Sequence, residues 1–395
     1  MGFLTFLFWF CLFIVFYSYL GYGLLLILLV GLKRIFRSRR GKYPETDFEP
    51  EVTLVVSAFN EEDFIEKKIE NCFQLIYPAE KLRLIFITDG STDDTPRIIA
   101  RYPAIQLLHE PLRRGKVAAM NRAMKQVGTA YVIFSDANTI LNPACVKEIV
   151  KHYRNPRAGG VAGEKKLVVS KADHAAGAGE GLYWKYESFL KKMDAAFYTV
   201  VGAAGELFSM RSELWEHTPE DIIIEDFVQS LKICMKGYTV RYEPGAFAME
   251  TSSLSMREEQ KRKVRICAGA FQAMVILKDL FNIFKYPVLS FQFISHRVLR
   301  WTISPVCLIL LFVVNGLIVL ENGSLFFTIL LISQMLFYLM AVVGWLFANR
   351  NIRVKQLYIP YYFLFMNISV FMGFYRFRKK NQSVLWERAS RQKMG

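Results

Sequence analysis

Charged side chains are missing from four long stretches of this 395-residue sequence, although Asp, Glu, Lys and Arg make up 22% of the chain. The charge-free stretches are residues 1–32, 302–320, 322–349 and 356–375. Each approaches or exceeds the ~20 residues that a helix needs to cross a hydrocarbon core about 30 Å thick. Between the first and second stretches the composition is ordinary. The sequence therefore excludes an ordinary soluble protein and predicts a polar domain held between membrane segments.

Several common motifs are also missing from the sequence. It contains no G-x-x-x-x-G-K-[ST] and no G-x-G-x-x-G, which disfavours nucleoside triphosphatases and dinucleotide enzymes. The six cysteines show no C-x-x-C spacing, so a thiolate metal cluster is not supported. Neither a zinc-finger spacing nor an aromatic RNA-binding signature accompanies the net charge of +15. We therefore expect no nucleic-acid partner.

The excess of positive charge lies beside the apolar stretches. Basic residues crowd 33–42 after the first stretch, 257–265 before the second and 376–380 after the last. Charge in these positions sets membrane topology and contacts anionic head groups, so membrane lipid is an expected partner. The same segments could bind partner subunits of an export or assembly machinery. The cluster at 33–42 predicts that the polar domain is cytoplasmic. Together with the apolar stretches, it predicts a multi-pass protein of the plasma membrane.

The chain divides into five expected parts: an N-terminal transmembrane anchor (1–41), a polar domain (42–276), an amphipathic interfacial helix (277–301), a C-terminal transmembrane region (302–375) and a basic tail (376–395). The first apolar stretch is too long for a signal peptide and has no cleavage site, so we expect a retained anchor.

Two segments in the C-terminal part of the chain differ from a regular apolar span. Aromatic residues alternate with cations in 277–301, which favours a helix lying in the membrane interface, with His296, Arg297 and Arg300 at the head-group level. Residues 357–375 contain Pro360 and Asn367, and a crossing there would leave the basic tail outside. This segment either spans the membrane or is re-entrant or interfacial.

Strand and helix patterns alternate in the first part of the polar domain. Apolar runs at 52–57, 83–88, 105–108 and 130–135 are separated by segments with helical spacing. This alternation predicts an α/β domain with a mostly parallel sheet that is covered on both faces. Ligands of such sheets bind beyond the carboxyl ends of the strands, so polar residues there are candidate site residues.

Acidic residues follow two of these expected strands. Asp89 ends the second, where an isolated Asp-Gly-Ser is usually a turn. Asp136 ends the fourth and is followed two residues later by Asn138. Two oxygen ligands at this spacing suit Mg²⁺ or Mn²⁺ shared with a diphosphate.

Seven motifs along the polar domain resemble those of the membrane-embedded family 2 glycosyltransferases, inverting enzymes related to cellulose, chitin, hyaluronan and poly-N-acetylglucosamine synthases. In order they are SAFNEE (57–62), ITDGSTDDT (87–95), RRGKVAAMNRAM (113–124), FSDAN (134–138), VGAAGELFSMR (201–211), IIIEDF (222–227) and QKRKVRICAG (260–269). The resemblance covers roughly residues 50–275 and the flanking spans. It implies a Rossmann-like GT-A fold.

The resemblance also implies a nucleotide-sugar donor, with a UDP-sugar expected, and Mg²⁺ or Mn²⁺ as cofactor. Residues matching the donor-binding positions are Ala58, Glu61, Asp89, Lys116, Asp136, Arg262 and Arg265. Asp136 and Asn138 match the metal-binding motif. The expected partner on the other side of the reaction is a saccharide or lipid-linked acceptor.

Asp226 matches the family's general base, which takes the proton of the acceptor hydroxyl. Residues matching the acceptor pocket are Gly202, Ala203, Ala204, Gly205 and Glu225. A single base suffices for inversion, whereas retention calls for a second carboxylate. The alternative for Glu225 and Asp226 is a pair of helix N-terminal acids that interact with the helix dipole.

The sequence departs from the family pattern at two places. Asn138 replaces a second aspartate, and Arg262–Ile266 lacks the Gln and Trp of the family's QxxRW motif. We therefore expect short or single sugar addition in cell-surface polysaccharide or glycolipid synthesis. The alternatives are a processive polysaccharide synthase and a catalytically degenerate scaffold or regulatory subunit. The aromatic segment 180–187 could stack on sugar or lipid, or could pack in the core.

Overall fold

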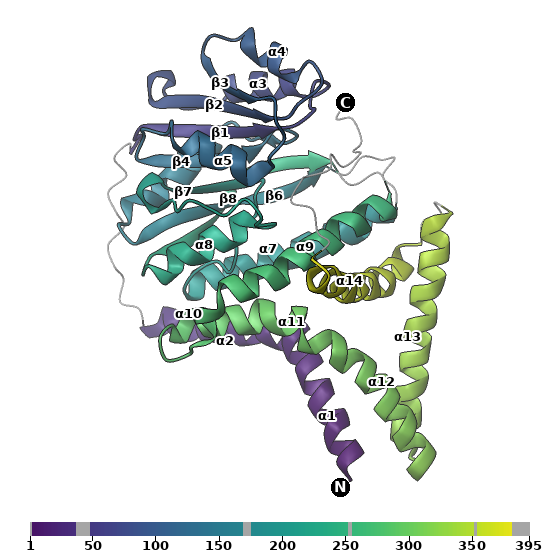
Figure 1. Ribbon diagram of the computed structural model, residues 1–395. Helices are drawn as coiled ribbons and strands as arrows, with labels where there is room; N and C mark the ends of the chain where they lie inside the picture. Colours follow the sequence, from purple (N-terminus) through teal and green to yellow (C-terminus); the bar gives the residue numbers. More distant parts are fainter. Residues whose placement is uncertain (1, 37–47, 169–174, 252–254, 351–353, 381–395) are drawn as a thin grey trace.

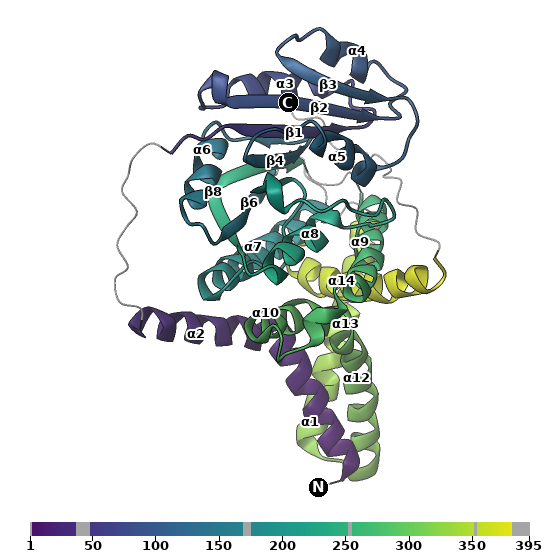
Figure 2. The ribbon, with the colours of Figure 1, turned by 60° about the vertical axis from the view of Figure 1, so that its left-hand side comes forward.

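The computed structural model describes residues 2–36, 48–168, 175–251, 255–350 and 354–380. A broad α/β domain stands on a narrower group of helices, and the N-terminal end lies at the tip of that group (Figure 1). The view turned by 60° shows the same arrangement (Figure 2). The expected boundary at residues 41 and 42 and the tail beyond residue 380 lie outside the described residues.

An eight-stranded mixed sheet forms the centre of the α/β domain, with strand order β3-β2-β1-β4-β7-β6-β8-β5. The strands are β1 (Val52–Ala58), β2 (Leu82–Asp89), β3 (Ile105–Glu110), β4 (Tyr131–Asp136), β5 (Ile140–Leu141), β6 (Ala158–Val168), β7 (Leu207–Arg211) and β8 (Thr239–Thr251). The four strands expected from the sequence are β1 to β4, and they pair in parallel. β7 runs antiparallel to β4 and β6.

Helices cover both faces of the sheet, because its central strands are apolar on both sides. All seven residues of β1 are buried. The core on one face is shared with α3 (Ile65–Phe73), α4 (Thr95–Ala100) and α6 (Cys145–Val150). The core on the other face is shared with α5 (Lys116–Met124), α8 (Glu225–Met235) and α9 (Met256–Ile276). Short 3₁₀ turns occupy Ala79–Lys81, Lys151–Arg154 and Ser212–Leu214.

The parallel strands bring their acidic ends to one edge of the sheet. In the register of the sheet, Ser57 of β1 pairs with Asp136 and Ala58 pairs with Thr88. Asp89 follows Thr88 at the end of β2. The end of β1 therefore lies between the two aspartates that the sequence singles out.

The N-terminal apolar stretch is bent rather than straight. Helix α1 (Phe3–Phe16) continues through a π-helical turn at Tyr17–Gly21 into α2 (Tyr22–Phe36). α1 extends away from the domain beside α12 (Ile303–Asn322), and α2 turns to run along the base of the domain (Figures 1 and 2). There, Tyr22 and Leu26 of α2 pack with Leu190 of α7 (Ala175–Phe197). The expected anchor thus supplies both a membrane helix and a support beneath the domain.

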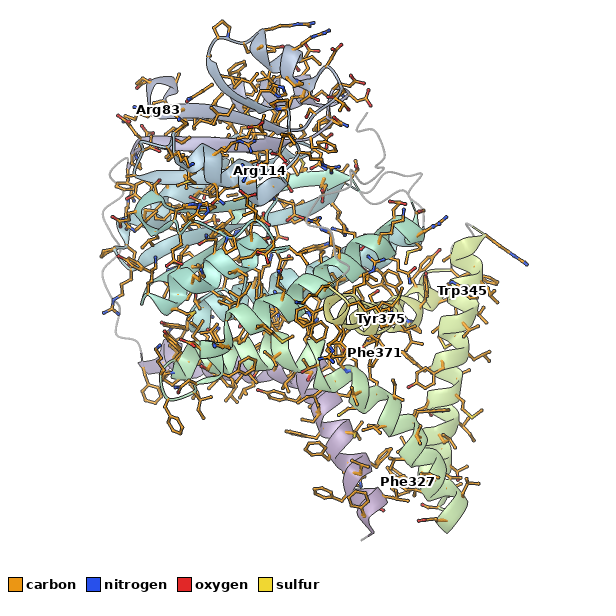
Figure 3. The ribbon with its side chains drawn as sticks, in the orientation of Figure 1. Arg83, Arg114, Phe327, Trp345, Phe371 and Tyr375 are labelled. Carbon is orange, nitrogen blue, oxygen red and sulfur yellow. The ribbon has the colours of Figure 1, made fainter. Side chains whose placement is uncertain are left out.

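Four helical segments are long and apolar enough to cross a membrane: Phe3–Phe36, Ile303–Glu321, Leu325–Ala348 and Gln356–Arg378. Three helices, α1, α12 and α13 (Leu325–Asn349), run in similar directions away from the domain, whereas α14 (Lys355–Arg378) runs across them (Figures 1 and 2). The labelled aromatic side chains Phe327 and Trp345 lie on the membrane helices, and the labelled Arg83 and Arg114 lie on the domain (Figure 3).

Helix α14 packs against the α/β domain. Half of its apolar window is buried, compared with 6% for α13. A Cβ atom at Gly373 would lie 2.4 Å from Cβ of Cys267, so glycine permits close approach of α14 to α9. The rings of Phe374 and Phe271 extend the contact, with centroids 5.0 Å apart. Helix α14 is thus held against α9, in contrast to the largely exposed α13.

The expectation of a single amphipathic helix over residues 277–301 is wrong. A 3₁₀ turn at Lys278–Phe281 is followed by α10 (Pro287–Phe293), a π-helical turn at Ile294–Val298 and α11 (Leu299–Trp301). His296 and Arg297 are buried and do not lie at the surface of the domain. Their partners lie on α7, about 100 residues away in the chain, so local sequence patterning could not reveal them.

Candidate functional site

The end of β2 holds the turn that precedes α5. Asp89 Oδ2 accepts hydrogen bonds from the backbone nitrogens of Arg114 (2.9 Å) and Gly115 (2.6 Å). Its other carboxylate oxygen lies 3.0 Å from Nη1 of Arg122. One oxygen of Asp89 therefore holds the backbone of the Arg-Gly-Lys turn, and the other holds Arg122 within α5.

A small pocket lies beside this turn and is lined by Ala58, Asp89 and Lys116, among others. The guanidinium carbon of Arg113 lies 3.7 Å from the ring centroid of Phe59, and both residues line the pocket. The predicted donor residue Glu61 lines neither this pocket nor the large cavity. It is buried, and its carbonyl oxygen accepts hydrogen bonds at the start of α3.

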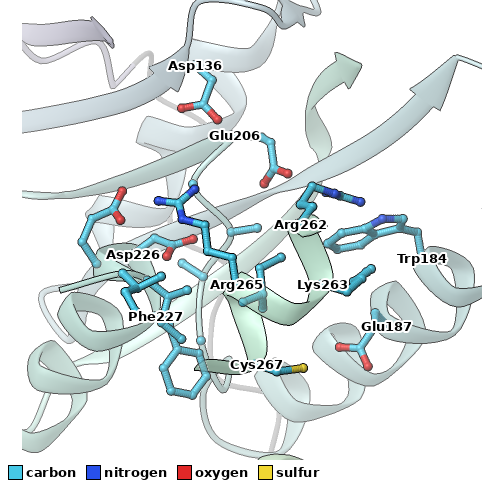
Figure 4. A pocket seen from close by; sticks show the side chains of 18 of the residues that line it. Asp136, Trp184, Glu187, Glu206, Asp226, Phe227, Arg262, Lys263, Arg265 and Cys267 are labelled. Carbon is cyan, nitrogen blue, oxygen red and sulfur yellow. The ribbon is translucent and has the colours of Figure 1, made fainter. Parts of the chain in front are cut away.

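A cavity of about 590 Å³ opens on the neighbouring side of Lys116. Figure 4 shows Asp136, Asp226 and Arg265 directed into one space, with Arg262 further along it. The cavity brings together these predicted site residues: Lys116, Asp136, Asn138, Gly202, Ala203, Ala204, Gly205, Glu225, Asp226, Arg262 and Arg265. They come from the end of β4 and the residues just after it, the loop before β7, the first turns of α5 and α8, and the middle of α9.

Lys116 is the central cation of the cavity. Its Nζ lies 2.8 Å from Oδ1 of Asp136 and 3.2 Å from Oε1 of Glu225. Burial acts to lower the pKa of Lys116, but the charges of Asp136, Glu225 and Asp226 outweigh it and raise the pKa above its ordinary value. Lys116 is therefore a permanent positive charge that balances a cluster of carboxylates.

Asp226 lies on the first turn of α8 and lines the same cavity as Lys116. Burial raises the pKa of Asp226 to about 7, and the neighbouring charge of Glu225 adds to the effect. Lys116 and the backbone N–H of Phe227 act in the opposite direction. A carboxylate with a pKa near neutrality can take a proton from a hydroxyl and release it again.

The loop Gly202–Gly205 comes close to both groups. A Cβ atom at Gly205 would lie 2.9 Å from Lys116 Nζ and 3.3 Å from Asp226 Oδ2. Gly202 has φ +88°, and a Cβ there would lie 2.1 Å from the Phe227 ring. Ser230 Oγ accepts a hydrogen bond from the Ala203 nitrogen at 3.0 Å. Helix α8 thus supplies both the acidic pair and a support for the glycine loop.

The residues after β4 fit a divalent cation. Asn138 Oδ1 is buried and has no hydrogen-bond partner among the described residues, and Asp136 contributes a carboxylate two residues earlier. No group of three or more His, Cys, Asp or Glu side chains suited to a metal occurs among the described residues. Two protein oxygens, completed by phosphate oxygens and water, form the kind of site in which Mg²⁺ is held together with a substrate.

The two predicted arginines of α9 differ in their availability. Arg262 forms a two-pronged interaction with buried Glu259, with both donor–acceptor distances 3.0 Å. Arg265 Nε is buried, and no group in the described part of the chain forms a hydrogen bond with it. Burial lowers the pKa of Arg265, although nearby Glu225, Asp136 and Asp226 oppose this shift. Arg265 is therefore the better placed of the two to receive an anionic group.

The cavity also includes residues that sequence reasoning missed as site residues. Glu206 follows the glycine loop and lies 2.6 Å from Lys165 Nζ. Burial acts to raise the pKa of Glu206, but Lys165 holds it well below the usual range. Lys191 and Arg297 also line the cavity. The sequence does carry one signal that could have identified this wall of the cavity. Trp184, Glu187 and Lys191 are spaced i, i+3 and i+7, and residues at this spacing share one face of a helix.

Arg297 connects the membrane segments to the glycine loop. Its Nε donates to the carbonyl oxygen of Val201 at 3.1 Å, and Nη1 donates to Glu187 at 3.0 Å. Arg300 reaches the other oxygen of Glu187 at 2.7 Å. Burial acts to raise the pKa of Glu187, but the two arginines keep it well below its ordinary value. The cations expected at the head-group level are therefore internal ion-pair partners.

The arrangement of the chain is that of a solved glycosyltransferase. The mannosyltransferase PcManGT from Pyrobaculum calidifontis, determined in complex with GDP-Man and Mn²⁺, is similar with a TM-score of 0.68 and 21% sequence identity. The likeness covers 95% of this chain and 99% of that one. The fold is thus an α/β GT-A domain with membrane helices, which confirms the expected fold class.

Sequence comparisons identify the family. The family model for glycosyl transferase family 2 matches residues 53–249. The poly-β-1,6-N-acetyl-D-glucosamine synthase of Staphylococcus aureus (strain MSSA476) is 27% identical over 248 residues, or 59% of this chain and 57% of that protein. The Staphylococcus epidermidis synthase of the same name is 22% identical over 278 residues, 67% of this chain and 66% of that protein. The chain belongs to glycosyltransferase family 2, and the match spans less than two thirds of these relatives.

Proposed function

We propose that this protein transfers a sugar from a nucleotide-diphosphate sugar to the hydroxyl of a saccharide or lipid-linked acceptor, with inversion at the reacting carbon. The observation that carries the proposal is that one cavity contains both a base and a metal site. The carboxyl group of Asp226 has a pKa of about 7, and the side-chain oxygens of Asp136 and Asn138 suit a divalent cation. A base of this pKa is suited to deprotonate a hydroxyl near neutral pH.

The donor would lie across the small pocket and the large cavity. The nucleotide fits the side of Asp89 and Ala58, so that its diphosphate reaches Asp136 and Asn138. A divalent cation held by these two residues would neutralise charge on the departing diphosphate. Hard oxygen ligands suit Mg²⁺ or Mn²⁺. The GDP-Man and Mn²⁺ of the similar mannosyltransferase support a nucleotide-sugar donor and a divalent cation here.

The remaining cavity residues have separate roles in this mechanism. Arg265 donates to the diphosphate, because its buried Nε has no partner within the described protein. Lys116 pairs with both Asp136 and Glu225 and balances their charge. Asp226 removes the proton of the acceptor hydroxyl as the new bond forms, and the diphosphate leaves from the opposite side of the reacting carbon. The bare backbone at Gly205 lets the acceptor sugar approach that carboxylate.

The number of sugars added to each acceptor distinguishes two candidate functions: short or single addition, and processive polymerisation. We favour short or single addition, because Ile266 occupies the position of the family's channel-mouth Trp. The names of the staphylococcal relatives, poly-β-1,6-N-acetyl-D-glucosamine synthases, support the processive alternative. A degenerate scaffold is disfavoured, because the cavity combines ionisable groups with perturbed pKa values and an arginine whose Nε has no hydrogen-bond partner within the described residues.

We also propose that the α/β domain faces the cytoplasm at the plasma membrane, with α1, α12 and α13 crossing and α14 lying at the interface. This arrangement puts Lys33, Arg34, Arg376 and Arg378 on the same side as the domain, in agreement with the positive-inside rule.

The test is metal-dependent turnover by the full chain purified in detergent. With UDP-N-acetylglucosamine and GDP-mannose as donors, we expect release of nucleoside diphosphate with Mn²⁺ or Mg²⁺ and no release with excess chelator. The Asp226→Asn variant should retain donor binding and lose about 10²–10⁴-fold in transfer. Mass spectrometry of the products separates single addition from polymerisation. Full transfer activity in Asp226→Asn would contradict the assigned base, and absence of turnover with a broad donor panel would favour the scaffold.

A further inference from the structure

The large cavity extends beyond the residues assigned to the reaction. Asp226 and Trp184 lie on opposite sides of the view in Figure 4, with Glu206 and Arg262 between them. A volume of about 590 Å³ falls within the ~300–1,000 Å³ of sites that enclose drug-sized ligands, which are larger than one hexose ring. The far part, which we call the distal lobe, is formed by Trp184, Glu187, Lys191, Glu206 and Lys263.

One face of α7 forms the wall of the distal lobe. Trp184, Glu187 and Lys191 follow each other at helical spacing, and all three line the cavity. Lys191 is only 4% exposed. Its ammonium lies 5.4 Å from the Trp184 ring centroid. No carboxylate or hydrogen-bond acceptor among the described residues contacts this buried ammonium group.

An unpaired buried lysine needs a reason, because burying a charge without a partner is costly. Burial lowers the pKa of Lys191, and Glu164, Glu206 and Glu187 compensate only from a distance. Nearby Lys165, in contrast, is engaged by Glu206 and Glu250. A hydrogen-bond acceptor on a ligand in the distal lobe would complete the environment of Lys191.

The chemistry of the distal lobe matches a sugar ring better than a phosphate. A half-buried indole offers a flat apolar surface for the C–H face of a sugar. The ammonium of Lys191 can donate to hydroxyl oxygens, and the carboxylate of Glu206 can accept from hydroxyl hydrogens. A fully ionised phosphate only accepts hydrogen bonds, so it would leave the acceptor oxygens of Glu206 and Glu187 unused, whereas sugar hydroxyls can both donate and accept.

We infer that the distal lobe is a second saccharide subsite, so that the preferred acceptor contains at least two sugar rings. The inference rests on the proposed function. The ring with the reacting hydroxyl lies at Gly202–Gly205, and the next ring lies in the distal lobe, beside Trp184 and within reach of Lys191. Glu206 links the two positions, since it directly follows Gly205, whose absent Cβ would lie 3.3 Å from Asp226 Oδ2.

The test is calorimetric binding of saccharides to the detergent-purified full chain in the absence of donor. The probes are N-acetylglucosamine against its β-1,6-linked disaccharide, and mannose against mannobiose. We expect at least one disaccharide to bind about fivefold or more tightly than its own monosaccharide, consistent with one aromatic contact. Equal affinities within both pairs would overturn the inference.

Variants separate recognition from folding. Trp184→Ala should remove the disaccharide preference, and Trp184→Phe should retain part of it. Lys191→Gln should weaken disaccharide binding about three- to tenfold, since one hydrogen bond to a charged group is lost. The matched control is Lys192→Gln, because Lys192 is the next residue of α7 and is exposed. A preference that survives Trp184→Ala in a protein of unchanged thermal unfolding would overturn the subsite.

Two further measurements distinguish the competing outcomes. Inorganic phosphate binding that is lost in Lys191→Gln, with disaccharide binding unchanged, would overturn the saccharide subsite in favour of an anion site. Donor hydrolysis to water should stay within about twofold of wild type in the Lys192→Gln control, because Lys192 is exposed and does not line the cavity. Loss of donor turnover in the wild type would contradict the proposed function, whereas absence of a disaccharide preference in an active enzyme would contradict this inference alone.

Discussion

The ammonium of Lys116 lies 2.8 Å from a carboxylate oxygen of Asp136, the residue proposed to hold the metal. The same ammonium lies 3.2 Å from Glu225, beside the proposed base Asp226. One cation therefore links the donor side of the cavity to the acceptor side. Its removal should change the ionisation of the base as well as the donor site.

The pH dependence of the wild type follows from Asp226. Its pKa is about 7, and the deprotonated form is the base. Below that value kcat/KM should fall about tenfold per pH unit, and above it kcat/KM should level off. Measurement from pH 5 to 9 at saturating Mn²⁺ tests this expectation. A profile that stays flat down to pH 5 would contradict the assignment of the base.

Substitution Lys116→Met should shift the acid limb of this profile. Loss of a nearby cation disfavours the carboxylate form, so the midpoint should move upward by about one pH unit or more, together with a loss of activity. The control is Lys125→Met, because Lys125 lies exposed at the other end of α5. An unshifted midpoint in Lys116→Met would mean that the ammonium group does not act on Asp226.

Gly202 and Gly237 offer a matched pair of glycine substitutions. Both residues have positive φ, +88° and +90°, but a Cβ at Gly202 would lie 2.1 Å from the Phe227 ring, whereas one at Gly237 would have no neighbour within 4 Å. Gly237→Ala should cost about 1–2 kcal/mol from backbone strain alone. Gly202→Ala should cost more and should also reduce transfer. Thermal unfolding in detergent measures both, and equal costs would rule out the clash.

Asn138 should limit the affinity for the metal. Asn138→Asp adds a charged oxygen ligand, so the Mn²⁺ concentration for half-maximal activity should fall several-fold. Asn138→Ala should raise it, because the buried Oδ1 is removed. Titration of Mn²⁺ at a fixed donor concentration provides the comparison. If Asn138→Ala leaves the half-saturating concentration unchanged, Asn138 is not a ligand.

The proposed topology can be tested by cysteine labelling. The six native cysteines are buried. A membrane-impermeant maleimide should label Glu321→Cys, in the last turn of α12, in intact cells. It should label Lys379→Cys, just after α14, only in permeabilised cells. Labelling of Lys379→Cys in intact cells would mean that α14 crosses the membrane.

Much of the fold could be predicted because its signals are local. The apolar runs of β1 to β4 and the helical spacing between them identify an α/β sheet. Parallel strands place their carboxyl ends together, so Asp89 and Asp136 could be expected at one edge. The cavity indeed contains Asp136 and Asp226, although their motifs lie 90 residues apart. The individual roles of these residues remain predictions.

Other features depend on partners that are distant in the chain. Sequence motifs treat Arg262 and Arg265 alike, but Glu259 engages the first while Nε of the second has no hydrogen-bond partner. Glu61 lies within a motif expected to bind the donor. Its carbonyl oxygen instead accepts hydrogen bonds from the first residues at the start of α3, and Glu61 lines neither the small pocket nor the large cavity. Availability for a ligand depends on the neighbours of a side chain, and a motif does not specify them.

In the membrane segments, too, some features follow from local sequence and others depend on distant partners. Hydropathy alone identifies four apolar helical segments, because the energetic cost of charge in hydrocarbon is a property of each residue. Hydropathy could not place α14 across the other helices or turn Arg297 inward to Glu187 and the Val201 carbonyl. These outcomes depend on the packing of α9 and α7, which offer a close-fitting surface and buried carboxylates. Composition and periodicity thus decide which segments form, and only long-range packing decides which of their polar groups remain free to bind a substrate.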